Sequence, residues 1–298
     1  MNSKKVAPDL NILEKIKRLT VVSMFSDEEL EEYLVLKGGN AMDLIHNLSS
    51  RSSLDLDFSM KHDFPGGVDD FRSRVERALQ RTFKPEGYEV FDVKMQEKPD
   101  AISDDMRDFW GGYGVEFKII TSELFEINKE SIDKLRQNAI SIGQGKKFLI
   151  DISRFEYIEG KEEVELDGYR IYVYTPEMIA CEKLRAICQQ LPEYGEIIRR
   201  SYKGKARARD FLDISVLVEK RKIDLTTDSN KNLISEMFKA KRVPLSFLGK
   251  IKEQGEFHEA DFASVQATVK PGEELEDFHY YFQNVVSLID KLEPLWNK

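Results

Sequence analysis

The feature that most constrains the fold is the stretch LVLKGGNAMDLIHNLSSRSSLDLDFSM, residues 34–60, in which a Gly-Gly pair precedes two closely spaced aspartates. Residues 53–60 alternate between apolar and other side chains, which predicts a strand with one buried face. Because residues two apart in a strand project from the same face, Asp55 and Asp57 are expected to point together, away from the core. The stretch therefore predicts two carboxylates side by side on one face of a sheet.

Two neighbouring carboxylates repel each other unless a cation neutralises them, and a divalent metal is the usual solution where oxygen ligands converge. Mg²⁺ favours one or two carboxylates with phosphate oxygens and water, an arrangement that a nucleoside triphosphate (NTP) completes. Upstream, Gly38 and Gly39 end a predicted strand, and a short helix over 41–48 follows at once. Glycines let the backbone approach a ligand, and amides at a helix start favour phosphate, which predicts a phosphate cradle. The alternative is a structural D-x-D pair on an exposed strand edge.

Most strands are predicted in the first part of the chain. Alternating or apolar segments indicate a sheet of about six strands. These segments are residues 33–39, 53–60, 88–95, 113–120, 147–155 and 169–175. Helices are predicted where Ser26 and Glu29 form a capping-box pattern, and where apolar residues recur at helical spacing over 68–83 and 127–140.

From Pro176 onward the apolar residues lie at helical spacing, and runs of β-branched residues are few. Helices are expected near residues 176–190, 206–220, 229–240 and 274–293. The sequence thus predicts an α/β (α+β) chain with two domains. A domain built on a mixed sheet is expected over residues 1–175 and an α-helical C-terminal domain over residues 176–298.

The charge distribution limits the kind of partner. The formal net charge of −9 excludes an evenly basic surface that coats nucleic acid, so any such contact must be local. One basic cluster occurs in RRSYKGKARARD, residues 199–210, which predicts either contact with nucleic-acid phosphates or a solvated helix end. The histidines, His46, His62, His258 and His279, show no metal-ligand spacing.

The sequence also favours a cytoplasmic location. No apolar run approaches the roughly 20 residues that a membrane span needs, and the charged N-terminus lacks the apolar core of a secretory signal. We therefore expect no membrane contact. The two cysteines, Cys181 and Cys188, lie seven residues apart in a helical pattern, too far for a disulfide, and are predicted to be buried thiols.

A family resemblance adds to this reading. LKGGNAMDLIH followed by RSSLDLDF resembles the first motif of the DNA polymerase β nucleotidyltransferase superfamily, and more narrowly the opening motif of the AbiEii/AbiGii toxin family. The residues that carry the narrower match are Lys37, Gly38, Gly39, Arg51, Ser53, Asp55 and Asp57. Later segments are similar to the family in the same order: KFLIDIS with Asp151, ACEKLRA with Lys183, and RARDFLDI with Arg209, Asp210 and Asp213.

The resemblance implies a nucleotidyltransferase-like catalytic domain over residues 1–175 and a role for each matched residue. Asp55 and Asp57 would hold two Mg²⁺ ions, and Asp151 would complete one metal site or accept the proton of the attacking hydroxyl. Lys183 would act in catalysis as a charge on the triphosphate. The implied nucleotide-binding residues are Gly38, Gly39, Asn40, Arg51, Ser53, Lys183, Arg209 and Asp210.

Each role has a structural alternative. Asp151 is otherwise an edge-strand charge, Lys183 a surface lysine with a buried stem, and Asp210 a member of a structural ion pair. Asn40 stands where the family more often has Thr or Ser, so an amide would replace a hydroxyl contact to phosphate.

The resemblance further implies a metal-dependent toxin of a toxin-antitoxin pair, which transfers a nucleoside monophosphate from an NTP to an RNA acceptor. The implied acceptor is the 3′ end of tRNA, and a separately encoded antitoxin would be the protein partner. Two alternatives stay open at this point. The acceptor could be a protein or a small molecule, or the chain could be a nucleotide-binding regulator without transfer activity.

Overall fold

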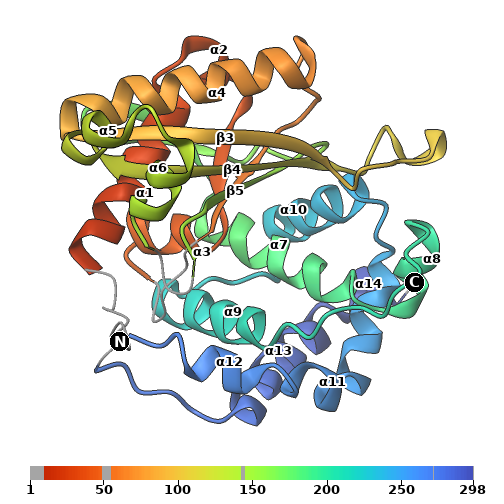
Figure 1. Cartoon of the computed structure of the whole chain (residues 1–298). Helices are drawn as coiled ribbons and strands as arrows, with labels where there is room; N and C mark the ends of the chain where they lie inside the picture. Colours follow the sequence, from red (N-terminus) through yellow and green to blue (C-terminus); the bar gives the residue numbers. More distant parts are fainter. Residues whose placement is uncertain (1–9, 49–54, 142–144, 271, 298) are drawn as a thin grey trace.

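The computed structural model describes residues 10–48, 55–141, 145–270 and 272–297, and strands from this part of the chain form one mixed sheet (Figure 1). The strand order is β3-β4-β5-β2-β1-β7-β6. The strands are β1 Val35–Lys37, β2 Leu56–Ser59, β3 Tyr88–Lys98, β4 Gly112–Thr121, β5 Phe148–Ser153, β6 Glu162–Leu166 and β7 Tyr169–Val173. β2 is parallel to β5 and β1 to β7, whereas the other neighbours are antiparallel.

Helices from the first part of the chain pack on both faces of this sheet. Phe83 of α4 contacts Phe117 on one face, whereas α5 and α6 pack against Phe91 and Ile120 on the other. The helices are α1 Leu10–Phe25, α2 Glu28–Tyr33, α4 Gly67–Phe83, α5 Ser122–Asn128 and α6 Ile132–Asn138, and short elements are α3 Gly38–Asn40, η1 Ala41–Ile45, η2 Lys84–Glu86 and η3 Asp104–Met106. α1 packs against α4, and α4 packs against β3. Phe25 of α1 contacts Phe58 of β2, with ring centroids 6.1 Å apart. The apolar face of β2 is therefore buried under α1.

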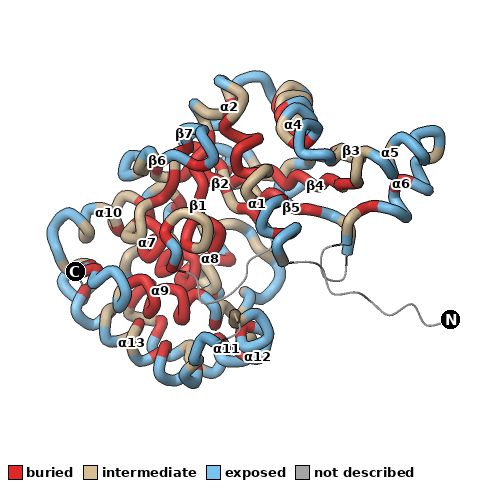
Figure 2. Tube along the Cα trace, turned by 90° about the vertical axis from the view of Figure 1, so that its left-hand side faces the viewer, coloured by how far each residue is buried: buried red, intermediate tan, exposed pale blue. Residues whose placement is uncertain are grey.

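The remaining helices gather on the side of the sheet opposite α1 and α4 (Figure 1). They are α7 Pro176–Cys188, α8 Pro192–Ile197, α9 Ala208–Arg221, α10 Asp228–Ala240, η4 Leu245–Glu253, α11 Gly255–Glu259, α12 Phe262–Gln266, α13 Phe278–Lys291 and α14 Glu293–Trp296. α7 packs against α9 and α10. Buried residues concentrate in the strands and in α7 and α9 (Figure 2).

The predicted fold class, a mixed sheet followed by a helical C-terminal region, is confirmed. One hydrophobic core includes both Phe58 of β2 and Phe211 of α9. The division into two domains at residue 175 stays a prediction.

Several local predictions need correction. The described residues form seven strands, because β6 was not predicted, and α1 is a further element beyond those predicted. Asp27, and not Ser26, caps α2, since its side chain accepts a hydrogen bond from the Leu30 amide. The helix expected over 41–48 begins at Gly38 and continues as the π-helical η1.

Two further predictions concern the cysteines and the membrane. Cys181 and Cys188 are buried free thiols in α7, as predicted, and burial raises the pKa of both. Within the described ranges, no helix combines the length and the apolar character that crossing a membrane requires.

Candidate active site

The sheet places three of the motif residues in one row. Asp57 on β2 lies directly beside Asp151 on the parallel strand β5 and beside Lys37 on β1. Residues that oppose one another on adjacent strands project from the same face. Leu56 and Phe58 alternate with Asp57 and are buried on the opposite face. Asp55 lies at a bend just before β2, two residues from Asp57 and outside the strand, so the predicted common face of the two carboxylates stays a prediction.

These carboxylates influence one another. Burial raises the pKa of Asp57 to about 6; Lys37 opposes this, whereas Glu182 and Asp151 add to it. Burial also raises the pKa of Asp55, and the charge of Asp151 raises it further. The cluster therefore favours binding of a proton or another cation.

The glycine turn packs directly on Asp57. Gly38 has a φ of +70°, in the left-handed region, and a Cβ at this position would lie 2.6 Å from Asp57 Oδ2. Asn40 is fully buried, and its Nδ2 donates a hydrogen bond of 2.6 Å to the Asp55 carbonyl oxygen. No described residue is a hydrogen-bond partner for Asn40 Oδ1. The Asn40 amide thus fastens the turn, including the buried Gly39, to the segment that carries the aspartates.

Replacing Gly38 with alanine should slow nucleotide transfer more than the same replacement at Gly168, whereas both variants should lose similar stability. We expect both Gly38→Ala and the control Gly168→Ala to destabilise the fold by about 1 to 2 kcal/mol, because alanine is strained at positive φ. A Cβ at Gly168, where φ is +83°, meets nothing within 4 Å, so only Gly38→Ala displaces a carboxylate. Thermal unfolding and nucleotide-transfer rates measure the two effects. Equal transfer rates in the two variants would contradict the assignment of the turn.

The later motif residues also come together. Lys183 Nζ on α7 lies 3.0 Å from Asp210 Oδ1 and 2.7 Å from Asp213 Oδ2, both on α9. Arg207 pairs with Asp210 as well. Lys183 is buried, with 4% of its surface exposed, yet its charge lowers the pKa of Asp57. Ion pairing, the structural alternative for Asp210, is therefore present, and the nucleotide-binding role of this group stays a prediction.

The remaining predicted site residues have different positions. Arg209, at the start of α9, is exposed. Its charge lowers the pKa of Asp55, which places the Arg209 side chain on the side of α9 that faces Asp55. Arg51 and Ser53 fall outside the described residues. Within the basic cluster, the Arg200 guanidinium donates to backbone carbonyls such as that of Gln189, whereas Arg199, Lys203, Lys205 and Arg209 are exposed.

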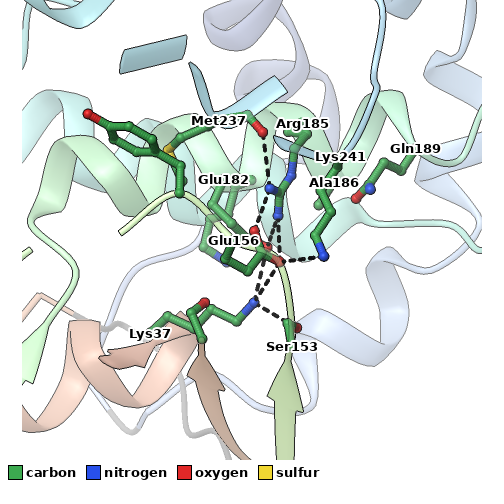
Figure 3. Close-up of polar contacts among 12 residues, drawn as sticks. Lys37, Ser153, Glu156, Glu182, Arg185, Ala186, Gln189, Met237 and Lys241 are labelled. Atoms are coloured by element: carbon green, nitrogen blue, oxygen red, sulfur yellow. Dashed lines mark hydrogen bonds and ion pairs between the residues drawn. The ribbon is translucent and has the colours of Figure 1, made fainter. Parts of the chain in front are cut away.

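A buried charge cluster beside the turn was not predicted (Figure 3). We call Lys37, Glu156, Glu182, Arg185 and Lys241 the Glu156 cluster. Arg185 Nη1 lies 2.6 Å from Glu156 Oε2, and the Nζ atoms of Lys37 and Lys241 each lie 3.6 Å from Glu156 Oε1. These cations hold the Glu156 pKa below its usual range despite burial, and burial lowers the pKa of Lys241 to about 8.

The Glu156 cluster connects the phosphate turn to the helices. Lys37 immediately precedes Gly38, and its Nζ also donates to Ser153 Oγ of β5 over 3.0 Å. Arg185 belongs to α7, and Lys241 directly follows α10. One buried carboxylate thus ties the base of the turn to two helices of the C-terminal region. The sequence signal for it is weak: charged residues within the otherwise apolar segment ACEKLRAIC.

The carboxylates of the candidate site supply only part of the coordination shell of a Mg²⁺ ion. In the described portion of the chain, no group of three Asp, Glu, His or Cys side chains is arranged to hold a metal ion by itself. Mg²⁺ requires less from a protein, since it usually takes one or two carboxylates and completes its shell with phosphate oxygens and water. Asp57 and Asp151, adjacent in the sheet and with Asp55 nearby, provide such a partial set.

The sequence matches one family model over most of its length. The model of the family described as "Nucleotidyl transferase AbiEii toxin, Type IV TA system" matches residues 20–284. The structure of JHP933 from Helicobacter pylori is 16% identical, with 98% of this chain and 95% of that chain covered and a TM-score of 0.48. A putative nucleotidyltransferase from H. pylori is 17% identical, with 98% of both chains covered and a TM-score of 0.49. No curated protein matches the sequence significantly.

Proposed function

The chain belongs to the AbiEii family of nucleotidyl transferase toxins of type IV toxin-antitoxin systems, and on this premise we propose that it modifies the 3′ end of a tRNA. The reaction would transfer a nucleoside monophosphate from an NTP to the terminal hydroxyl of the RNA. An antitoxin would be the protein partner, separately encoded, and the cytoplasm, which supplies tRNA and NTP, would be the location. The observation that supports this proposal best is the row of Lys37, Asp57 and Asp151 beside Gly38.

The residues of the row have complementary tasks in this reaction. The amides of Gly38 and Gly39 would bind the phosphates, with room provided by the absence of a Cβ next to Asp57. When bound between Asp55, Asp57 and Asp151, two Mg²⁺ ions would supply charge neutralisation at the phosphates. Lys183 and Arg209, whose charges already act on the aspartates, would add positive charge on the side of α7 and α9.

The transfer step itself is a substitution at phosphorus. The terminal hydroxyl oxygen of the acceptor forms a bond to the α-phosphorus, and the bond from that phosphorus to the bridging oxygen breaks, which releases pyrophosphate. Asp151, next to Asp57 on the neighbouring strand, would accept the proton of the hydroxyl. Asp151 lies at the edge of the three aspartates, a position that would allow contact with the acceptor.

Incubation with labelled nucleotides tests the proposal. The full-length protein would be incubated with each α-³²P-labelled NTP, Mg²⁺ and total tRNA, beside Asp57→Asn and the control Asp167→Asn. Asp167 is an exposed aspartate that pairs with Arg18. It lies in the turn before β7, six residues ahead of Val173, where β7 meets β1. We expect label at the tRNA 3′ end with the wild type and Asp167→Asn, and none with Asp57→Asn.

Other outcomes would redirect or overturn the proposal. Label on the protein itself, or on a small molecule, would replace tRNA with that acceptor while keeping the site. Binding of NTP without incorporation into any acceptor would contradict the transfer reaction. Transfer by Asp57→Asn at the wild-type rate would contradict the assignment of the site.

A further inference from the structure

A cleft of about 710 Å³ opens beside Asp151, lined by residues of β5, of the segment 98–113, of α7 and of the segment 198–202. Sites for small ligands typically have volumes of about 300 to 1,000 Å³. Of the predicted metal-binding carboxylates, only Asp151 is among the described residues that line the cleft. Lys37, which precedes the phosphate turn, lines the cleft, whereas Gly38, Gly39 and Asn40 do not. The cleft therefore extends from Asp151 past the base of the turn without including the turn itself.

A lysine reaches into this cleft across a strand. Lys98 Nζ, at the end of β3, donates to Asp151 Oδ1 over 2.5 Å, although β4 lies between β3 and β5. Gly114 of β4 lies directly beside Asp151, and a Cβ on it would lie 2.2 Å from Lys98 Cε. The missing side chain at Gly114 thus lets the Lys98 ammonium group lie beside Asp151.

An aromatic ring is held at the same cleft. Tyr202 lines the cleft with 67% of its surface exposed. The segment around it is fixed to the C-terminal end of α7: the Arg200 guanidinium donates to the carbonyl of Gln190 over 3.3 Å, and the Lys205 amide donates to Gln190 Oε1 over 2.9 Å. Gly204 packs so closely on Gln190 that a Cβ at Gly204 would lie 2.2 Å from the backbone carbonyl oxygen of Gln190. Tyr202 is therefore an exposed ring on an anchored backbone.

Exposed aromatic rings combined with cations are the chemistry that binds single-stranded nucleic acid, because bases stack on the rings and phosphates pair with the cations. Lys98, Arg199 and Tyr202 provide this combination within one cleft. An NTP fits the cleft less well, since its triphosphate is expected at the Gly38 turn. The two substrates of a transfer reaction must meet at the carboxylates from separate places.

We propose that this cleft binds the 3′-terminal nucleotides of the RNA acceptor, with one base stacked on Tyr202 and a phosphate beside Lys98. The terminal hydroxyl then lies next to Asp151. This inference rests on the proposed transfer to RNA and assigns the acceptor its own binding site.

Binding measurements on Tyr202 variants test the cleft directly. The probe is a short fluorescein-labelled single-stranded RNA with a free 3′ hydroxyl, titrated with full-length protein in the absence of NTP and followed by fluorescence anisotropy. We expect Tyr202→Ala to weaken RNA binding about tenfold or more, Tyr202→Phe to retain it, and Tyr169→Ala to leave it unchanged. Tyr169 is a suitable control because it is 41% exposed and lies on β7, outside the lining of the cleft.

Parallel titrations with an α,β-methylene NTP analogue separate the acceptor from the nucleotide. We expect Tyr202→Ala to bind the analogue as the wild type does. A loss of analogue binding instead of RNA binding would make the cleft a nucleotide site and overturn the inference. Unchanged RNA binding by Tyr202→Ala would also overturn it, although label would still appear in tRNA if the proposed function holds. If RNA binding depends on Tyr202 but no label enters RNA, the cleft assignment stands and the transfer proposal fails.

Discussion

Replacing Asp57 with asparagine should abolish nucleotide transfer and, at the same time, stabilise the metal-free protein. Burial, opposed by Lys37 and reinforced by Glu182 and Asp151, raises the pKa of Asp57 from 3.8 to about 6. A carboxyl whose folded pKa exceeds its unfolded value binds protons more tightly in the folded state. Its contribution to stability is therefore present at low pH and is lost as the pH rises from about 4 through about 6.

The expected size of this effect follows from the shift. About two pKa units correspond to about 3 kcal/mol, and solvent contact of the half-buried side chain reduces the effect to about 1 to 2 kcal/mol. We expect Asp57→Asn to unfold at a higher temperature than the wild type at pH 8 in EDTA, and at nearly the same temperature at pH 5. Transfer should fall by more than about 100-fold, because the variant loses an anionic oxygen ligand.

Asp92→Asn is the matched contrast. Its side chain pairs with Arg136 and Lys118, and the hydrogen bond from Arg136 is the main reason that the Asp92 pKa is lowered. A lowered pKa gives the opposite sign: the stabilisation is present at neutral pH and is lost as the pH falls. Asp92→Asn should therefore destabilise the protein at pH 8 and retain transfer. Destabilisation by Asp57→Asn at pH 8 would contradict the account of its environment.

Glu156→Gln should cause the largest loss of stability. Lys37, Arg185 and Lys241 converge on this single buried carboxylate, and its removal leaves buried positive charges without their shared partner. Breaking a buried ion pair on one side typically costs about 3 to 5 kcal/mol. Because the cations hold the Glu156 pKa below its usual range, its contribution is present at neutral pH and is lost as the pH falls.

Urea unfolding at pH 7.5 measures this loss. The control is Glu159→Gln, since Glu159 is exposed and pairs only on the surface with Lys61, a kind of pair that contributes about 0 to 1 kcal/mol. We expect a clearly lower urea midpoint for Glu156→Gln and a nearly unchanged midpoint for Glu159→Gln. Equal midpoints would show that the Glu156 cluster does not support the fold.

Much of the sheet could be predicted because its strands alternate in the sequence or are continuously apolar. β6 could not, since Glu162, Glu163 and Glu165 give it the composition of a loop, and only pairing with β7 at the edge of the sheet makes it a strand. α1 was missed for a related reason. The run from Thr20 to Val22 is β-branched and locally favours a strand, whereas packing against α4 requires a helix.

The candidate site also has a part that could be predicted from the sequence and a part that could not. The family resemblance implies that Asp57 and Asp151 act at one metal site, and the strand register places the two residues side by side, whereas their roles stay predictions. The Glu156 cluster has no characteristic spacing in the sequence, because its members come from β1, a loop, α7 and the end of α10. In a sequence, charged residues that become buried cannot be distinguished from charged surface residues. Only the apolar neighbours of Arg185 indicate that its side chain is buried.

Binding of Mn²⁺ together with an α,β-methylene NTP analogue, followed by electron paramagnetic resonance of the free ion, tests the central claim most directly. If Asp57 and Asp151 hold the metal of a bound nucleotide, the wild type and Asp167→Asn will take up Mn²⁺ when the analogue is added. Asp57→Asn and Asp151→Asn will then take up far less. Equal uptake by all four proteins would contradict the placement of the nucleotide and its metal at this row of the sheet.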